Sequence, residues 1–265
     1  MNAYDFYNYL ISDYFKNKQY YSLKGGLSQL VDKLDNSIIQ RGGMIHKSEK
    51  CIEINKNKEL FKIKTDKMDK SIYITNSIIV AVPPEASKKI KGIPQNNKII
   101  EVDNKIIGKP LYRIYAIYPK QDGKVWFSNI NRIISDTPIR NIIPINKDIG
   151  LIMISYTDYI FANKMNQYNL DGKVLDIIQS SLKSIFPDKD IPKPTFYTGY
   201  YWKNGVHYWK PNSSSKRDFI KSIQPIKNYK FYLMGESYSP RQGWIEGSLI
   251  SANKVLDHFT QPSLI

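Results

Sequence analysis

The residues with the clearest capacity for chemistry lie near the end of the chain. An apolar run from Phe231 to Met234 ends in Gly235-Glu236, and a helix is predicted to begin near Trp244 or Ile245. The first turn of a helix has N–H groups without intrahelical partners and carries roughly half a positive charge. The pattern therefore predicts a strand, a turn and a helix start that stabilises negative charge at its tip.

The predicted C-terminal helix has two different faces. One carries apolar residues at helical spacing: Ile245, Leu249, Ala252 and Leu256. The neighbouring face carries small residues: Gly247, Ser248 and Ser251. Small residues allow a sheet or a flat ligand to approach the helix backbone closely. A reduced flavin is one such ligand, and its negative charge collects at the N1–C2=O edge of the ring. An ordinary strand–helix unit with a glycine needed for packing is the alternative interpretation.

The stretch from Met234 to Ser251 resembles the C-terminal signature of the flavin-containing amine oxidase family, which includes monoamine and polyamine oxidases. Two further stretches resemble the family in the same order. One runs from Tyr21 to Leu30 and the other from Ser77 to Pro84. The Gly-x-Gly-x-x-Gly motif that binds the ADP part of FAD is missing, so the chain resembles only the C-terminal portion of the family fold.

The resemblance implies roles in binding FAD. Gly235 and Glu236 would lie beside its ribityl and pyrophosphate portion, and Ile245 would donate its backbone N–H to the flavin C2=O. Gly243 and Gly247 would belong to the same cofactor-binding turn.

The resemblance also implies an aromatic cage in front of the flavin ring. Trp244 would form one wall, and the opposite wall falls near residues 205–208, where either His207 or Tyr208 could serve. Some relatives attach the flavin through a cysteine in this region. Val206 and the absence of cysteine there imply a flavin that is not covalently bound.

Many family members use a lysine, through a water molecule, near flavin N5. Arg113 is the best counterpart in this sequence, and Lys109 aligns less well. Arginine stays charged at ordinary pH, so it could order water but could not act as a base. An enzyme with Arg113 in place of this lysine would therefore transfer protons differently from other members of the family.

Three functions follow as hypotheses. The first is a fragment or subunit of an FAD-dependent amine oxidoreductase that transfers hydride from an amine α-carbon to flavin N5, with the dinucleotide-binding part on a second chain. The second is a degenerate, non-catalytic binding module of the same fold. The third, a nucleic-acid-binding protein, rests only on the net charge of +15; the lysines are spread along the whole chain, which favours compositional bias over a binding patch.

The composition predicts a folded protein without a membrane segment or a metal. Of the 265 residues, 42% are hydrophobic, and no run approaches the ~18 apolar residues of a membrane span. Cys51 is the single cysteine and the three histidines lie far apart, so we expect no metal site and a reducing, cytoplasmic location.

We expect a mixed α/β (α+β) fold, corresponding to the C-terminal part of a two-domain amine oxidase. Residues 1–86 would form a partial FAD-binding domain, with a helix over 27–38, an antiparallel ribbon over 44–75 and a strand at 78–82 buried on both faces. Residues 87–225 would form a substrate lobe and residues 226–265 the returning strand and helix. Elements expected in the lobe are strands at 111–118, 125–128, 151–156 and 195–202 and a helix at 174–185.

Overall fold

The computed structural model describes residues 7, 11, 23, 25–67 and 72–260, with the side chains of 259 and 260 excepted. The predicted mixed α/β class is observed. The chain divides into two compact units: residues 1–106 with 209–265, and residues 107–208. The sequence analysis places the corresponding boundaries after residues 86 and 225. Each unit is described by itself below.

The first unit begins with a four-stranded sheet. Its strands follow the order β3-β2-β1-β5, and the bounds are β1 (Cys51–Asn57), β2 (Leu60–Thr65), β3 (Ile72–Thr75) and β5 (Lys91–Gly92). β1, β2 and β3 pair antiparallel, as predicted for the ribbon. The run at residues 44–46, which was expected to begin that ribbon, forms no strand.

A second sheet of the first unit has two parallel strands, β4 (Ile78–Val80) and β11 (Phe231–Leu233). All three residues of β11 are buried, as are Ile78 and Val80. The prediction of a strand covered on both faces was wrong for β4, because the side chain of Ile79 is 41% exposed. Parallel sheets normally contain more strands and are covered on both faces. This pair therefore has the form of an incomplete sheet.

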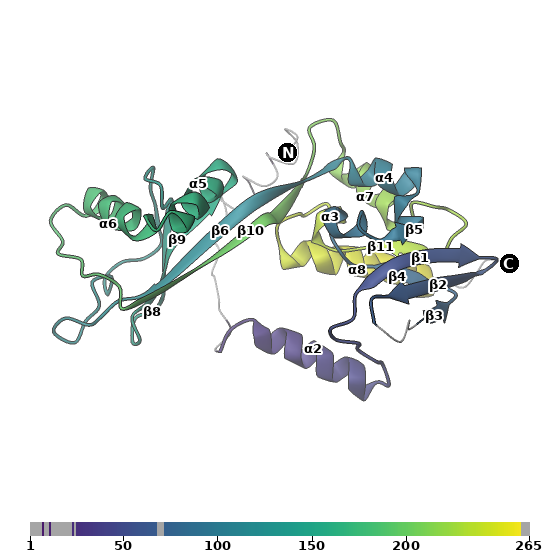
Figure 1. Ribbon diagram of the computed structural model, residues 1–265, viewed down its shortest axis with the longest axis horizontal. Helices are drawn as coiled ribbons and strands as arrows, with labels where there is room; N and C mark the ends of the chain where they lie inside the picture. The colour runs from purple at the N-terminus through teal and green to yellow at the C-terminus, as the bar shows by residue number, and fades with distance from the viewer. Residues whose placement is uncertain (1–6, 8–10, 12–22, 24, 68–71, 261–265) are drawn as a thin grey trace. The chain divides into compact units, whose positions relative to one another are not determined.

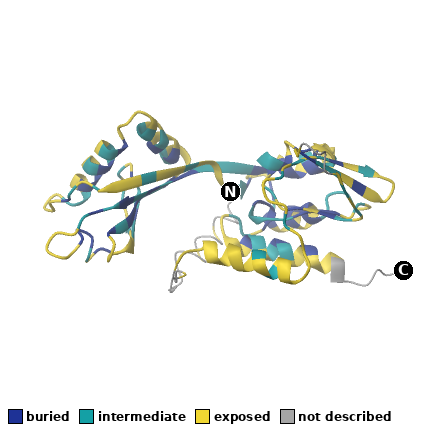
Figure 2. Cartoon of the chain, turned by 60° about the horizontal axis from the view of Figure 1, so that its bottom comes forward, coloured by how far each residue is buried: buried dark blue, intermediate teal, exposed yellow. Residues whose placement is uncertain are grey.

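The helix α2 (Ser28–Gln40) confirms the helix expected over 27–38 and has no buried residue. It ends at glycines, and Gly42 has a φ of 81°, a conformation common just after helix ends. Its exposed apolar side chains include Leu30, Val31, Leu34, Ile38 and Ile39. Most of the helix accordingly has the colour of exposed residues in Figure 2. Residues 21, 22 and 24 of the family-like stretch at 21–30 lie outside the described residues.

The remaining helices of the first unit are α3 (Pro84–Ser87), α4 (Asn97–Asp103), α7 (Ser215–Ile223) and α8 (Ile245–Thr260). Figure 1 shows α8 beside β4 and β11. One apolar core joins these elements, with Phe61, Ile99, Ile223, Phe231 and Val255 among its buried side chains. α4 and α7 were not predicted, because each is short and its apolar positions are few.

The second unit is a five-stranded sheet in the order β10-β6-β9-β8-β7. The bounds are β6 (Ile106–Ile117), β7 (Ile133–Ile134), β8 (Asn141–Asn146), β9 (Leu151–Asp158) and β10 (Phe196–Trp209). The helices α5 (Tyr159–Leu170) and α6 (Val174–Ile185) lie over the sheet in Figure 1, and their buried side chains share one core with Ile114 and Ile152.

All but one of the elements expected in this unit are found, and β7, β8 and α5 were not expected. Residues 125–128 form turns and no strand, and their apolar side chains are buried because Val125, Trp126 and Phe127 insert into the core. The helix α5 was missed, since its apolar residues show little helical periodicity.

Candidate functional site

The turn that follows β11 is the first part of the candidate site. Gly235 has a φ of 128° and Gly243 a φ of 86°, conformations that L side chains rarely adopt. Between them lies a short 3-10 helix, η2 (Glu236–Tyr238). A Cβ atom on Gly235 would meet nothing within 4 Å. The glycine is therefore required by the backbone path and leaves open space beside it.

Glu236 closes this turn. Its Oε1 atom accepts a hydrogen bond from the backbone N–H of Gly243, with 2.5 Å between the two atoms. This contact ties the start of the turn to the residues just before α8. The carboxylate thus has a structural role within the turn, in addition to the cofactor contact that the resemblance implies.

Trp209 and Gln242 fix the other side of the turn, and the sequence analysis did not single them out. The indole N–H of the buried Trp209 donates to the carbonyl of Ser239 at 2.8 Å, and its backbone N–H donates to Gln242 Oε1 at 2.6 Å. Gln242 in turn donates through Nε2 to the carbonyl of Ser237 at 2.5 Å. In the sequence, the polar side chain of the glutamine before Gly243 is the feature that could have indicated these hydrogen bonds.

The small face of α8 packs against the turn. A Cβ atom on Gly247 would lie 2.1 Å from the carbonyl oxygen of Arg241, so only glycine fits there. The backbone N–H of Gly235 donates to Ser251 Oγ at 2.9 Å. The predicted close approach at the small residues is therefore present, and it is made by the turn itself.

The apolar residues at the start of α8 are exposed instead. Trp244 and Ile245 have 47% and 54% of their surface accessible. Ile245 is the first helical residue, and its N–H therefore has no carbonyl of the same helix to bind. The positive end of α8, with Glu246 in its first turn, therefore lies beside exposed apolar side chains.

Arg113 belongs to the second unit and is described there. It pairs with Tyr156 across β6 and β9, and its guanidinium carbon lies 4.8 Å from the centre of the Tyr156 ring. The Nε atom of Arg113 is buried and has no hydrogen-bond partner among the described residues. A buried donor without an acceptor is uncommon and requires an explanation, of which a bound ligand or water is one.

An aromatic pair lies at the ends of β9 and β10. The rings of Tyr159 and Tyr208 stack with 6.0 Å between their centres, and Lys109 Nζ lies 5.2 Å from the centre of the Tyr159 ring. Burial, together with the charge of Asp158, raises the pKa of Tyr159, although a hydrogen bond with Tyr208 opposes the shift. His207, the alternative to Tyr208, is buried at 4% exposure.

Tyr159 is held in an unusual backbone conformation. Its φ of 51° places a bulky residue in the left-handed region, and such outliers cluster at functional sites. The sequence analysis missed this residue, because nothing in the sequence marks a tyrosine that adopts a positive φ.

The described residues contain no group of three or more His, Cys, Asp or Glu side chains placed to hold a metal ion. Within the same residues, every helix is too short or too polar to cross a membrane.

Comparisons with known proteins find a distant viral relative and no matching family model. No protein-family model matches the chain. The chain is 26% identical over 204 residues to "Uncharacterized protein R188" of Acanthamoeba polyphaga mimivirus, an alignment that covers 69% of this chain and 39% of the viral protein. The chain therefore spans about two fifths of the length of this relative.

Proposed function

We propose that the chain is the flavin-facing part of an FAD-dependent amine oxidoreductase, completed by a second chain that carries the dinucleotide-binding part. The observation that carries this proposal is the turn from Gly235 to Gly247. It combines two glycines at positive φ, an unobstructed space beside Gly235 and the start of α8 at Ile245.

The residues of this turn fit a flat, anionic cofactor edge. The N–H of Ile245 would donate to the flavin C2=O, and the positive end of α8 would stabilise negative charge there. The exposed Trp244 would contact the face of the ring. FAD, when bound, would supply the redox chemistry by accepting a hydride from the carbon next to an amine nitrogen.

Exposed apolar surface on the first unit supports a requirement for a second chain. α2 has no buried residue, and Ile245, Leu249 and Leu256 of α8 are all more than half exposed. The edge strand β4 also exposes Ile79. Exposed apolar side chains that form a contiguous patch mark interaction surfaces.

The second unit would bind the amine. Tyr208 and Tyr159 present stacked rings, and aromatic faces attract substituted ammonium groups. Of the two aromatic candidates, Tyr208 would contact the amine, because His207 is buried. Arg113, with its unpartnered Nε, would order a water molecule.

An Ile245→Pro variant tests the proposal directly. Proline is tolerated at the first position of a helix and lacks the N–H group, so this change removes the predicted donor while α8 remains folded. Ile245→Ala keeps the N–H and is the matched control. The chain is co-expressed with its neighbouring-gene products, FAD is added, and the visible flavin absorbance retained after gel filtration is measured.

We expect the wild type and Ile245→Ala to retain flavin and Ile245→Pro to retain much less. Circular dichroism checks that all three proteins are equally folded. A colourless wild type, both alone and with its co-expressed products, would overturn the proposal.

A second candidate function is a binding module of the same fold that has lost catalysis. Arg113 favours it, because a guanidinium that lies over the Tyr156 ring cannot take a proton at ordinary pH. In this case the protein should retain flavin, but no primary amine, secondary amine or polyamine should bleach the flavin absorbance under anaerobic conditions.

A further inference from the structure

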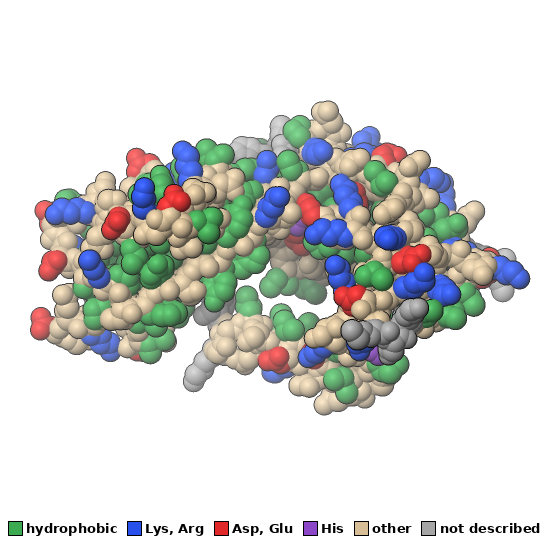
Figure 3. Space-filling view, in the orientation of Figure 1, with side chains coloured by type: hydrophobic (Ala, Val, Ile, Leu, Met, Phe, Trp, Pro, Cys, Tyr) green, Lys and Arg blue, Asp and Glu red, His purple; other side chains and the backbone are tan. Residues whose placement is uncertain are grey.

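A basic pocket lies between α4, α7 and α8 of the first unit. Its volume is about 580 Å³, within the range of pockets that bind small organic ligands. Figure 3 shows Lys and Arg side chains gathered over α4 and α7. Lysines from four segments line the pocket, among them Lys98 of α4, Lys221 of α7 and Lys254 of α8.

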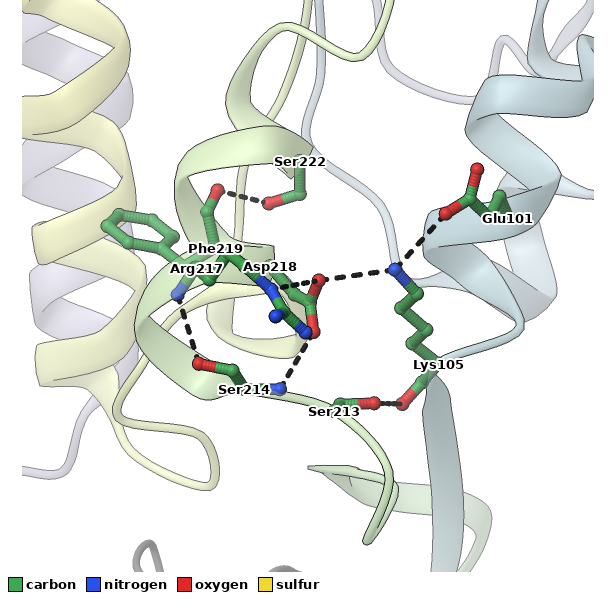
Figure 4. A network of polar contacts seen from close by, with 8 residues as sticks. All are labelled: Glu101, Lys105, Ser213, Ser214, Arg217, Asp218, Phe219 and Ser222. Atoms are coloured by element: carbon green, nitrogen blue, oxygen red, sulfur yellow. Dashed lines mark hydrogen bonds and ion pairs between the residues drawn. The ribbon is translucent and has the colours of Figure 1, made fainter.

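Two of the lining lysines are neutralised by nearby carboxylates. Lys105 Nζ lies 3.2 Å from Glu101 and 3.2 Å from Asp218, as Figure 4 shows. Lys254 pairs with Asp257 at 2.9 Å. These five groups, two ammonium and three carboxylate, therefore leave no net positive charge for a ligand.

Three other lysines remain without an acidic partner among the described residues: Lys98, Lys221 and Lys227. The position of Lys227 is fixed by its loop, since Gln224 Nε2 donates to the carbonyls of Lys227 at 3.0 Å and Tyr229 at 2.8 Å. Three ammonium groups around one pocket create a positive potential that favours a multiply charged anion.

The pocket also has apolar lining. Val102 and Ile223 are buried at its base, whereas Ile220 is 56% exposed. The imidazole of His258 lines the pocket and lies 5.3 Å from the ring of Tyr232. A ligand that carries only phosphate would leave these surfaces unused, whereas a flat ring would cover them.

We propose that this pocket binds an organic diphosphate with a flat ring, such as a nucleoside diphosphate. The phosphates would contact Lys98, Lys221 and Lys227, and the ring would lie against Ile220 and His258. The site is separate from the flavin-facing turn, because His258 and Ile245 lie near opposite ends of α8, on the order of 20 Å apart at 1.5 Å per residue.

Calorimetric titration of the full chain with ADP, inorganic pyrophosphate and adenosine tests the proposal. We expect ADP to bind, pyrophosphate to bind more weakly and adenosine to give no measurable heat. A Lys221→Gln/Lys227→Gln variant should bind ADP about tenfold or more weakly. The control Lys62→Gln/Lys89→Gln makes the same change in net charge at two exposed lysines outside the pocket and should stay within about twofold of wild type.

Ile220→Asn is the second variant, and it should weaken ADP but leave pyrophosphate unchanged. Absence of ADP binding would overturn the proposal. So would equal losses in the pocket and control lysine variants, or DNA binding that is as sensitive to the pocket lysines as ADP binding, because these results would assign the lysines to a general basic surface. Retention of added FAD should be the same in all variants, which separates this site from the proposed flavin site.

Discussion

The hydroxyl group of Tyr238 donates a hydrogen bond to Oδ1 of Asp103, and the two oxygens are 3.0 Å apart. Both residues are fully buried, and the bond joins the turn after β11 to the last residue of α4. The second oxygen of the Asp103 carboxyl, Oδ2, has no partner among the described residues. Burial raises the pKa of Asp103 to about 6, although the bond from Tyr238 acts to lower it.

This raised pKa predicts a pH-dependent stability. The folded chain holds the Asp103 proton more tightly than the unfolded chain. Protonated Asp103 therefore stabilises the folded state below about pH 4, and this stabilisation is lost as the pH rises through about 6. Asp103→Asn stays neutral and can still accept from Tyr238. Across this window wild type should lose roughly 1–3 kcal/mol of unfolding free energy relative to Asp103→Asn. Urea titrations at a series of pH values measure the difference, and parallel curves would contradict the assignment.

Asp218 should behave in the opposite way. Burial acts to raise its pKa, but hydrogen bonds from the Ser214 N–H and from Lys105 lower it overall. Its contribution is therefore present at neutral pH and is lost as pH falls through the folded pKa. Asp218→Asn should cost about 1–3 kcal/mol at neutral pH and less in acid. Asp257→Asn breaks an exposed pair and should change stability by less than about 0.5 kcal/mol.

Gly247→Ala should destabilise the protein even though alanine is the better helix former. Its Cβ atom would overlap the carbonyl oxygen of Arg241 and the Oγ atom of Ser239. We expect a loss of about 1–3 kcal/mol by thermal unfolding. Ser248→Ala, on the next residue of the same helix, should be nearly neutral. A Gly247→Ala protein as stable as wild type would show that the turn does not pack so closely.

The exposed apolar face of α2 should matter for association and not for folding. Val31→Ser/Leu34→Ser should change the unfolding free energy of the isolated chain by less than about 1 kcal/mol, because neither side chain is buried. The same variant should fail to co-purify with the second chain that we propose. The matched control is Ile134→Ser/Ile145→Ser, which alters two exposed isoleucines of the second unit. A stable variant that still associates would remove α2 from the interface.

The Tyr159–Tyr208 pair can be tested by ultraviolet titration of tyrosine ionisation. Tyr208→Phe removes the hydrogen bond that lowers the pKa of Tyr159 and keeps the stacked ring, so the pKa of Tyr159 should rise further. Tyr208→Leu removes the stacking as well and should cost about 0.5–1.5 kcal/mol of stability. Tyr200→Phe on the same strand is exposed and should leave the Tyr159 titration unchanged. An unaltered titration in Tyr208→Phe would contradict the contact.

Sequence patterns predicted the elements whose apolar spacing is regular. The helix at 174–185 was found because its apolar periodicity reflects burial on one side, and the strands around 111–118 and 151–156 because they are runs rich in apolar residues. The helix from residue 245 was also found from its apolar spacing, although Ile245, Leu249 and Leu256 on that face are exposed. Trp126 and Phe127 were assigned to a strand because apolar runs resemble one another whether they lie in a strand or in a buried turn.

Parts of the candidate site could not be predicted, for a different reason. The glycines at 235, 243 and 247 can be recognised in the sequence as markers of the turn and of the close approach to α8. Trp209, by contrast, reaches the turn from a segment about 30 residues earlier, a contact that sequence spacing does not encode. The positive φ of Tyr159 depends on tertiary packing and contradicts local preference.

The parallel pairing of β4 with β11 sets an order of events during synthesis. The partners Ile78 and Phe231 are separated by about 150 residues, so this sheet cannot form until the ribosome has produced almost the whole chain. The second unit is continuous from residue 107 to residue 208 and can fold as soon as it emerges. Until β11 has been synthesised, β4 remains an unpaired apolar strand. The speed of translation and the access of chaperones to this strand therefore determine the yield of folded protein.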